Sequence, residues 1–203
     1  MRCGAVVLCG GLSSRMGRPK ALLPWRGRTM IEHAVGVLRE ATDAVVVVTS
    51  AELDLPPLPA KVVRDLAPRL GPLGGLRDGL EQLDAELAYA TSTDAPFLTP
   101  EFVRAMLAFG QAAAPEIGGF IQPLCAAYPV ALAAKAGELL SSGRTGLLHL
   151  LEAANFRKVL PAELPDLRAA RGCNTPQEYF AALQEDGAPL ASECPPGRAK
   201  GSP

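Results

Sequence analysis

The apolar residues of this chain follow two alternating patterns. Unbroken apolar runs of about four to eight residues are typical of strands buried on both faces of a sheet, and apolar residues three and four positions apart are typical of helices with one buried face. The unbroken runs predict strands at 5–9, 44–48, 61–63, 87–93 and 157–160, with two more at 117–121 and 124–130. The helical spacing predicts helices at 29–40, 100–110, 131–140, 145–153 and 176–185, and one beginning at 71.

Several predicted helices carry their own start signals. Thr29, Thr99 and Thr175 each stand directly before a helical pattern, where a threonine hydroxyl can accept a hydrogen bond from the first turn. Thr99 and Thr175 are followed by proline, which fits the first helical position. Glu178 completes a capping box with Thr175. Residues 111–115 are expected to form a loop.

Alternating strands and helices predict an α/β fold, with three α/β/α layers and a mostly parallel sheet. Ligands of such sheets bind beyond the carboxyl ends of the strands. Gly10, Thr49, Asp65 and Asp94 all fall at predicted strand ends, so we expect the functional site there. We expect a single domain at 1–187, followed by a disordered tail at 188–203 that is rich in Pro, Gly and Ser.

Composition and charge narrow the classes of partner. The chain has 203 residues, of which 48% are hydrophobic and 20% charged, enough for one core. A net charge of −1 gives no support for a nucleic-acid or acidic-membrane partner. No apolar run approaches the ~20 residues of a membrane span, and no signal-peptide pattern opens the chain, so a cytoplasmic protein is expected.

The cysteines form no recognisable framework. There are five, an odd number, with no C-x-x-C pair and only two histidines to add imidazole ligands. This pattern argues against a zinc site or a disulfide scaffold. Cys173 is either a catalytic nucleophile or a buried residue that fills space in the core (a buried filler), and we expect the second.

A glycine-rich, basic stretch follows the first predicted strand. Gly10 and Gly11 allow close backbone approach, and Arg15, Arg18 and Lys20 add positive charge. This combination favours a nucleoside triphosphate, although no Ser or Thr follows Lys20 as in a Walker loop. The alternative interpretation is a glycine-rich turn with solvated basic side chains.

Asp94 follows the strand at 87–93 and precedes the helix at 100–110. A lone aspartate there is commonly a cap or turn residue, but Thr99 already supplies the cap. Asp94 is therefore the candidate Mg²⁺ ligand.

A second glycine pair, Gly74-Gly75, stands near the start of the helix that begins at 71. Its backbone could approach a base or a phosphate, or the pair could simply belong to a helix-initiating turn. The expected apolar stripe of this helix is Leu76, Leu80, Leu83 and Leu87.

The first loop resembles a known signature. Leu8-Cys9-Gly10-Gly11-x-Ser13-x-Arg15-Met16-Gly17-x-x-Lys20 is similar to the loop of the molybdenum cofactor nucleotidyltransferases, which have a sugar-nucleotide-transferase-like (Rossmann-like) α/β fold. The paired glycines resemble the guanylyltransferase branch, whereas the cytidylyltransferase branch more often has Ala-Ala-Gly. Three later segments also resemble the family: Gly71-Pro72-Leu73-x-Gly75, Asp94-x-Pro96 and Gln122-Pro123-Leu124-x-x-x-Tyr128.

The resemblance implies transfer of GMP from GTP to the phosphate of molybdenum-bound molybdopterin. It implies Mg²⁺ on Asp94, with Arg15 and Lys20 balancing the leaving pyrophosphate. The expected partners are these small molecules and, transiently, molybdoenzymes or other cofactor-biosynthesis proteins. The implied binding residues are Leu8, Cys9, Gly10, Gly11, Lys20, Asp65 for the nucleoside, Gly75, Asp94, and Asn174 for the acceptor.

The chain departs from the family pattern in three places. Cys9 replaces the usual Ala, Thr49-Ser50 stands where the family has Asn, and Gly172 replaces the first Asn of Asn-x-Asn-Thr-Pro. The alternatives are therefore a cytidylyltransferase for the same cofactor, a nucleotidyltransferase for another small phosphorylated acceptor, and a non-enzymatic cofactor carrier.

Overall fold

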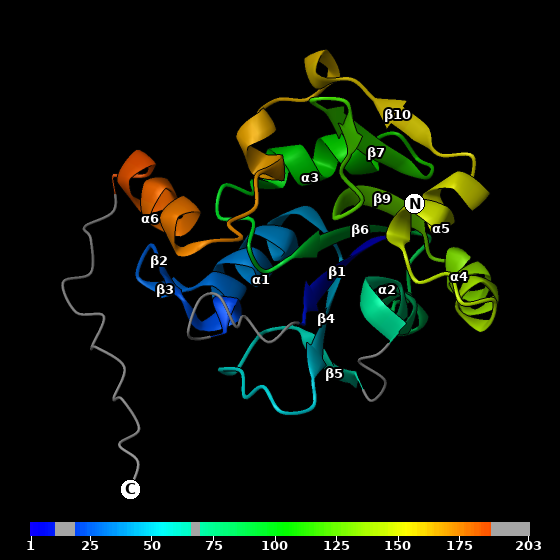
Figure 1. Cartoon of the computed structure of the whole chain (residues 1–203), viewed down its shortest axis with the longest axis horizontal. Coiled ribbons are helices and arrows are strands. Elements are labelled where there is room, and N and C mark those ends of the chain that lie inside the picture. Colours follow the sequence, from blue (N-terminus) through cyan, green and yellow to red (C-terminus); the bar gives the residue numbers. More distant parts are fainter. Residues whose placement is uncertain (11–18, 66–69, 188–203) are drawn as a thin grey trace, which may run out of the picture.

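A twisted sheet forms the centre of the computed structural model, which describes residues 1–10, 19–65 and 70–187 (Figure 1). The strand order is β10-β7-β9-β6-β1-β4-β5, and β8 pairs with β7. The strands are β1 (Cys3–Cys9), β4 (Ala44–Ser50), β5 (Lys61–Asp65), β6 (Leu87–Ser92), β7 (Ala113–Ile117), β8 (Phe120–Ile121), β9 (Cys125–Pro129) and β10 (Arg157–Val159).

Most strand pairs are parallel. β1 pairs in parallel with β4 and β6, β4 with β5, and β10 with β7, whereas β9 lies antiparallel between β6 and β7. The reversal follows the short β7–β8 hairpin, whose turn residues Gly118 and Gly119 have φ of 60° and 82°. The prediction of a mostly parallel α/β sheet is confirmed.

Helices cover both faces of the sheet (Figure 1). Alternate residues of β1 point to opposite faces, so Ala5 and Val7 pack with α1 and α3, while Val6 packs with α2, α4 and α5. These helices are α1 (Met30–Ala41), α2 (Gly71–Glu81), α3 (Pro100–Leu107), α4 (Leu132–Ser141) and α5 (Leu147–Ala153).

The C-terminal helix α6 (Pro176–Glu185) packs away from the sheet, against a small hairpin of β2 (Pro24–Trp25) and β3 (Arg28–Thr29). Their side chains form a third apolar cluster. Short 3₁₀ helices, η1 (Lys20–Leu22), η3 (Pro161–Glu163) and η4 (Leu167–Ala170), complete the described elements. The apolar cluster, called the satellite core below, consists of Leu23, Trp25, Met30, Phe97, Cys173, Tyr179, Ala182 and Leu183.

The predicted helix starts are confirmed. The hydroxyl oxygens of Thr29, Thr99 and Thr175 accept hydrogen bonds from the backbone N–H three residues later, at 3.3, 3.3 and 3.2 Å. Thr175 and Glu178 form the expected capping box.

Three predicted elements have the wrong boundaries. The helix that begins at 71 ends at Glu81, so its stripe includes neither Leu83 nor Leu87, and Leu87 instead begins β6. Residues 113–115 belong to β7 rather than to a loop. The expected strand at 117–121 consists of the last residue of β7, the Gly118-Gly119 turn and β8. The Ala-Ala-Pro start of β7 has low strand propensity, and its burial between β9 and β10 overrides it.

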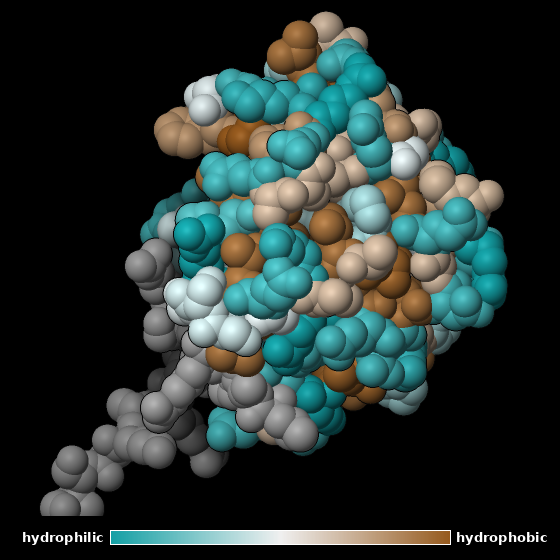
Figure 2. Space-filling view, turned by 90° about the vertical axis from the view of Figure 1, so that its right-hand side faces the viewer, coloured by the Kyte–Doolittle hydropathy of each residue, from teal (hydrophilic) through white to brown (hydrophobic). Residues whose placement is uncertain are grey.

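The surface over α2, α4 and α5 mixes apolar and hydrophilic side chains (Figure 2). Leu148 of α5 contributes to the apolar part, with 41% of its surface exposed. Among the helices of the described residues, none combines the length and the hydropathy that a membrane crossing requires.

Gly79 tests the packing of α2 on the sheet. A methyl group there would come within 2.4 Å of Val6 Cγ1 and 3.2 Å of Val48 Cγ2. Because both neighbours are branched and buried, Gly79→Ala should lower the free energy of unfolding by about 1–3 kcal/mol. In Gly137→Ala, the control within α4, the new methyl group meets no described atom within 4 Å, so stability should rise by about 0.5–1 kcal/mol. Equal melting temperatures for the two variants would contradict this packing.

Candidate nucleotide-transfer site

Three distant segments meet at the ammonium group of Lys20. Lys20 Nζ lies 2.7 Å from Asp94 Oδ2 and donates a hydrogen bond of 2.9 Å to Asn174 Oδ1. The Lys20 and Asp94 side chains are only 20% and 15% exposed, so the contact is partly shielded from solvent. The structure thus brings together the basic loop, the strand-end aspartate and the C-terminal motif that the sequence singled out separately.

Asp94 is held by backbone and side-chain contacts beyond β6. The hydroxyl of Ser92, the last residue of β6, donates to Asp94 Oδ1, and the backbone N–H of Cys173 donates to the Asp94 carbonyl at 2.8 Å. Gly172 lies against the same carboxyl, since a methyl group on it would be 3.5 Å from Asp94 Oδ1. The carboxylate is therefore fixed in direction at the carboxyl edge of the sheet.

Lys20 is positioned by the turn that carries it. The Leu23 N–H donates to the Lys20 carbonyl at 3.1 Å, and the Met30 N–H donates to the Leu23 carbonyl at 2.9 Å, which ties η1 to the start of α1. Ala21 and Leu23 are buried. The side chain of Lys20 is thereby directed from an anchored turn.

Asn174 is held by the first turn of α6. Glu178 Oε2 accepts hydrogen bonds from the backbone N–H groups of Asn174, at 2.6 Å, and Thr175, at 3.0 Å. These hydrogen bonds stabilise the ionised carboxyl and lower the pKa of Glu178 below its usual value. The backbone of Asn174 is fixed, and its side chain reaches Lys20.

Asp65 lies along the same edge of the sheet but on another strand. It ends β5, opposite Ser50 of β4, whereas Asp94 follows β6. Strands β6, β1, β4 and β5 are consecutive, so three strand spacings, about 14 Å, separate β6 from β5. Arg64 orders the turn beside Asp65 by donating from one nitrogen to the carbonyls of Ser50, Ala51 and Leu53.

The predicted glycines have different surroundings. Gly75 is buried within α2, and a methyl group there would be 3.3 Å from Leu8 Cδ2, so it allows the helix to lie close to β1. Gly10 is exposed beyond the end of β1. Gly11 and Arg15 lie outside the described residues.

The thiols near the cluster are poor nucleophiles. Burial raises the pKa of both Cys9 and Cys173 to about 11, and the nearby Asp94 charge adds to the effect at Cys173. Cys173 is 4% exposed and packs in the satellite core, as expected for a buried filler.

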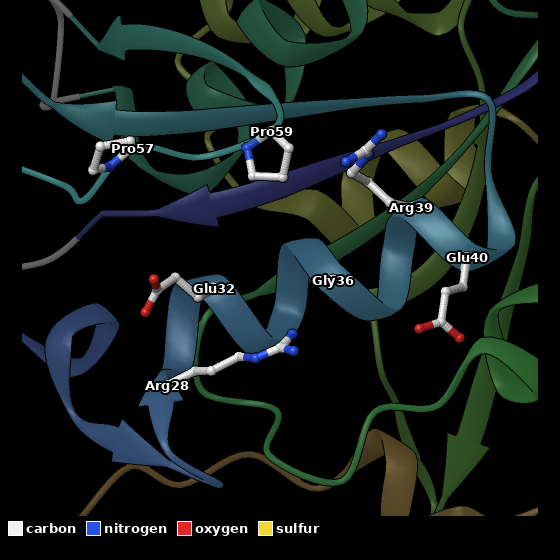
Figure 3. A pocket seen from close by; sticks show the side chains of 7 residues that line it. All are labelled: Arg28, Glu32, Gly36, Arg39, Glu40, Pro57 and Pro59. Carbon is white, nitrogen blue, oxygen red and sulfur yellow. The ribbon is translucent and has the colours of Figure 1, made fainter.

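No group of three or more His, Cys, Asp or Glu residues gathers into a metal site within the described ranges. A separate groove of about 520 Å³ runs along α1 (Figure 3). Its two arginines and two glutamates balance in charge, and none of the predicted site residues lines it. The lining residues are Arg28, Glu32, Gly36, Arg39, Glu40, Pro57 and Pro59.

Sequence reasoning missed Ser92 and the backbone N–H of Cys173, which both orient Asp94. Ser92 has a local signal, since it lies two residues before the aspartate at a strand end. The contact from Cys173 joins positions 79 residues apart (173 − 94), and no local pattern predicts it.

Comparison with known proteins places the chain in a family. The profile of the MobA-like NTP transferase domain matches residues 5–159. A probable molybdenum cofactor guanylyltransferase of Bacillus mycoides is 31% identical over 196 residues, which cover 91% of this chain and 97% of the relative. A protein of the same name from Mycobacterium bovis is 33% identical over 186 residues, covering 85% and 92%.

Solved structures agree on the fold. A molybdopterin-guanine dinucleotide biosynthesis protein A of Archaeoglobus fulgidus superposes with a TM-score of 0.76 at 21% identity, covering 91% of this chain and 98% of that one. A 2-C-methyl-D-erythritol 4-phosphate cytidylyltransferase of Thermus thermophilus gives 0.69 at 18% identity, with the same coverage. The family resemblance of the sequence motifs is confirmed: the chain belongs to the MobA-like NTP transferase domain family and is a nucleotidyltransferase.

Proposed function

We propose that this nucleotidyltransferase transfers GMP from GTP to the phosphate of molybdenum-bound molybdopterin, forming the guanine dinucleotide cofactor and pyrophosphate. The observation that carries the proposal is the contact of Lys20 Nζ with both Asp94 and Asn174. It unites a phosphate-binding loop, a candidate metal carboxylate and a candidate acceptor residue. The guanylyltransferase names of the relatives support GTP as donor and the molybdenum cofactor as acceptor.

The proposed chemistry is a single in-line displacement. An oxygen of the acceptor phosphate forms a bond to the α-phosphorus of GTP, and the bond from that phosphorus to the pyrophosphate oxygen breaks. The attacking oxygen is already anionic, so the site has no need of a strong general base. Positioning and neutralisation of the oxygens that gain charge supply the catalysis. Lys20 and Arg15 are the residues assigned to the departing pyrophosphate.

Mg²⁺ fits this site through Asp94. Magnesium is commonly held by one or two carboxylates together with substrate phosphates, and Asp94 offers one carboxylate in a fixed direction. Its Oδ2 contacts Lys20, so the ion and the ammonium group compete for one oxygen. When held by Asp94, the ion would neutralise the charge that develops on the reacting phosphate. We therefore expect Lys20 to bind the triphosphate only when it is released from Asp94.

The sheet edge matches an extended nucleotide. Asp65 and Ser50 mark one end of the site and Asp94 the other, about 14 Å apart by strand spacing. We place the nucleoside at β4 and β5 and the reacting phosphate at β6. The acceptor then enters from the side of Asn174.

Nucleotide binding provides the first test. A thermal-shift series with GTP, CTP, ATP and UTP, each with and without Mg²⁺, should show a selective, Mg²⁺-dependent rise in melting temperature with GTP. Binding to the folded state alone adds about 2.7 kcal/mol at a hundredfold excess over Kd, so a specific ligand is detectable. A preference for CTP would indicate the cytidylyl branch. GTP binding without acceptor-dependent pyrophosphate release would indicate a carrier.

Substitutions at the ion pair separate its two roles. Asp94→Ala should abolish Mg²⁺-dependent pyrophosphate release while circular dichroism shows a folded protein, because the metal loses its carboxylate. Lys20→Ala should weaken GTP binding by about tenfold or more, measured by calorimetry, with a smaller effect on acceptor binding.

Asp84→Ala and Lys135→Ala are matched controls, since both residues are exposed and make surface ion pairs. Normal turnover in folded Asp94→Ala, or unchanged GTP affinity in Lys20→Ala, would contradict the corresponding assignment.

A further inference from the structure

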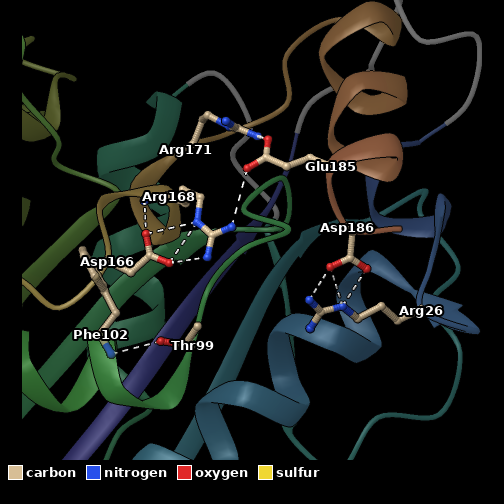
Figure 4. Close-up of polar contacts among 8 residues, drawn as sticks. All are labelled: Arg26, Thr99, Phe102, Asp166, Arg168, Arg171, Glu185 and Asp186. Atoms are coloured by element: carbon tan, nitrogen blue, oxygen red, sulfur yellow. Dashed lines mark hydrogen bonds and ion pairs between the residues drawn. The ribbon is translucent and has the colours of Figure 1, made fainter. Parts of the chain in front are cut away.

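The end of α6 contacts the β2–β3 hairpin through one ion pair. Arg26 Nε donates to Asp186 Oδ1 at 3.1 Å and to Oδ2 at 2.9 Å, and its Nη2 also contacts Oδ1 (Figure 4). The Asp186 side chain is only 11% exposed. The Arg26 guanidinium lowers the pKa of Asp186, chiefly through these hydrogen bonds. This two-pronged geometry is stronger and more directional than a typical surface pair.

Both partners occupy positions that local structure disfavours. Arg26 has a φ of 50° and precedes Gly27 at 75°, a two-residue hairpin turn that favours Asn, Asp or Gly at its first position. Asp186 caps the carboxyl end of α6, directly after Glu185, where negative charge opposes the helix dipole. Glu185 is compensated by Arg168 and Arg171 (Figure 4). The contact between Arg26 and Asp186 explains both exceptions.

The ion pair is connected to the site through α6. Glu178, on the first turn of the helix, holds the backbone of Asn174, whose side chain accepts from Lys20. Tyr179 is buried and donates from its hydroxyl to the Pro24 carbonyl in the hairpin. A displacement of α6 against the hairpin would therefore displace Asn174.

The satellite core includes residues close in sequence to Lys20, Asp94 and Asn174. Leu23 is three residues after Lys20, Phe97 is three residues after Asp94, and Cys173 directly precedes Asn174. Among the described residues, this core has eight buried members and is smaller than the two clusters on the faces of the sheet, so it holds α6 less firmly than they hold the other helices. The ion pair joins the C-cap of α6 to the hairpin and restrains the last turn of the helix.

We propose that Arg26 and Asp186 are positioning residues, whose ion pair fixes α6 so that Asn174 faces the acceptor. This inference rests on the proposed function, because the acceptor is molybdenum-bound molybdopterin. It assigns a role on the acceptor side of the site to two residues outside the motifs. GTP binding should be affected less, because we place its nucleoside at β4 and β5.

The test compares Arg26→Asn, Asp186→Ala and the double variant with Lys135→Asn as a charge-matched control. Asparagine suits this turn position better than arginine does. If Arg26 acted only on the turn, Arg26→Asn would therefore not raise KM for the acceptor. Our account predicts faster hydrogen exchange of backbone amides 174–186 and a rise of about fivefold in KM for molybdenum-molybdopterin. Kd for GTP should change by less than about twofold. In the double variant, KM for the acceptor should rise no more than in either single variant.

Unchanged amide exchange, or altered exchange with unchanged acceptor KM, would overturn the inference. An equal rise in acceptor KM and in Kd for GTP would also overturn it, because it would indicate that the whole protein, and not only α6, is less rigid. If the unsubstituted protein transfers no GMP, the proposed function fails. Amide exchange then decides the positioning role by itself, and unchanged protection of Asn174 in Arg26→Asn would contradict it.

Discussion

The contact of Lys20 with Asp94 and Asn174 is the interaction on which the arrangement of the site depends. One ammonium group, partly shielded from water, satisfies a carboxylate and an amide from segments far apart in the chain. Removal of Lys20 or Asp94 leaves the other charged group partly buried without this contact, which is costly. In the proposed function, the same ammonium group binds the triphosphate. The contact with Asp94 and Asn174 then holds the cation at the place where the triphosphate is proposed to bind.

The sheet places this contact at the edge formed by the carboxyl ends of its parallel strands. Parallel pairing of β6, β1, β4 and β5 aligns their carboxyl ends, so Asp94, Gly10 and Asp65 lie at the same edge of the sheet. Thr49 pairs with Arg64, one residue before Asp65, and is buried. Buried Gly75 and Gly79 of α2 let this helix pack closely on β1 and β4. The C-terminal helix is attached separately through the satellite core. The sheet thus orients Asp94 and Asp65, whereas α6 orients Asn174 through the hydrogen bonds of Glu178.

Local patterns predicted most of the fold and only part of the site. Unbroken apolar runs found β1, β4 and β6, and threonine caps found three helix starts, because both signals lie within a few residues. The Ala-Ala-Pro start of β7 was missed because its strand state comes from tertiary burial. Asp94 was identified by its strand end, whereas its contacts with Lys20 and Cys173 join residues 74 and 79 positions away. No local pattern encodes such distances.

Isotope labelling of GTP shows which phosphorus is transferred to the acceptor. The protein would be incubated with Mg²⁺, molybdenum-molybdopterin and GTP carrying radioactive phosphorus at either the α or the γ position. Our account predicts that the α label enters the pterin dinucleotide, while the γ label leaves in an equal amount of pyrophosphate. Transfer that requires CTP instead of GTP, or α label found only in free GMP regardless of acceptor, would contradict it.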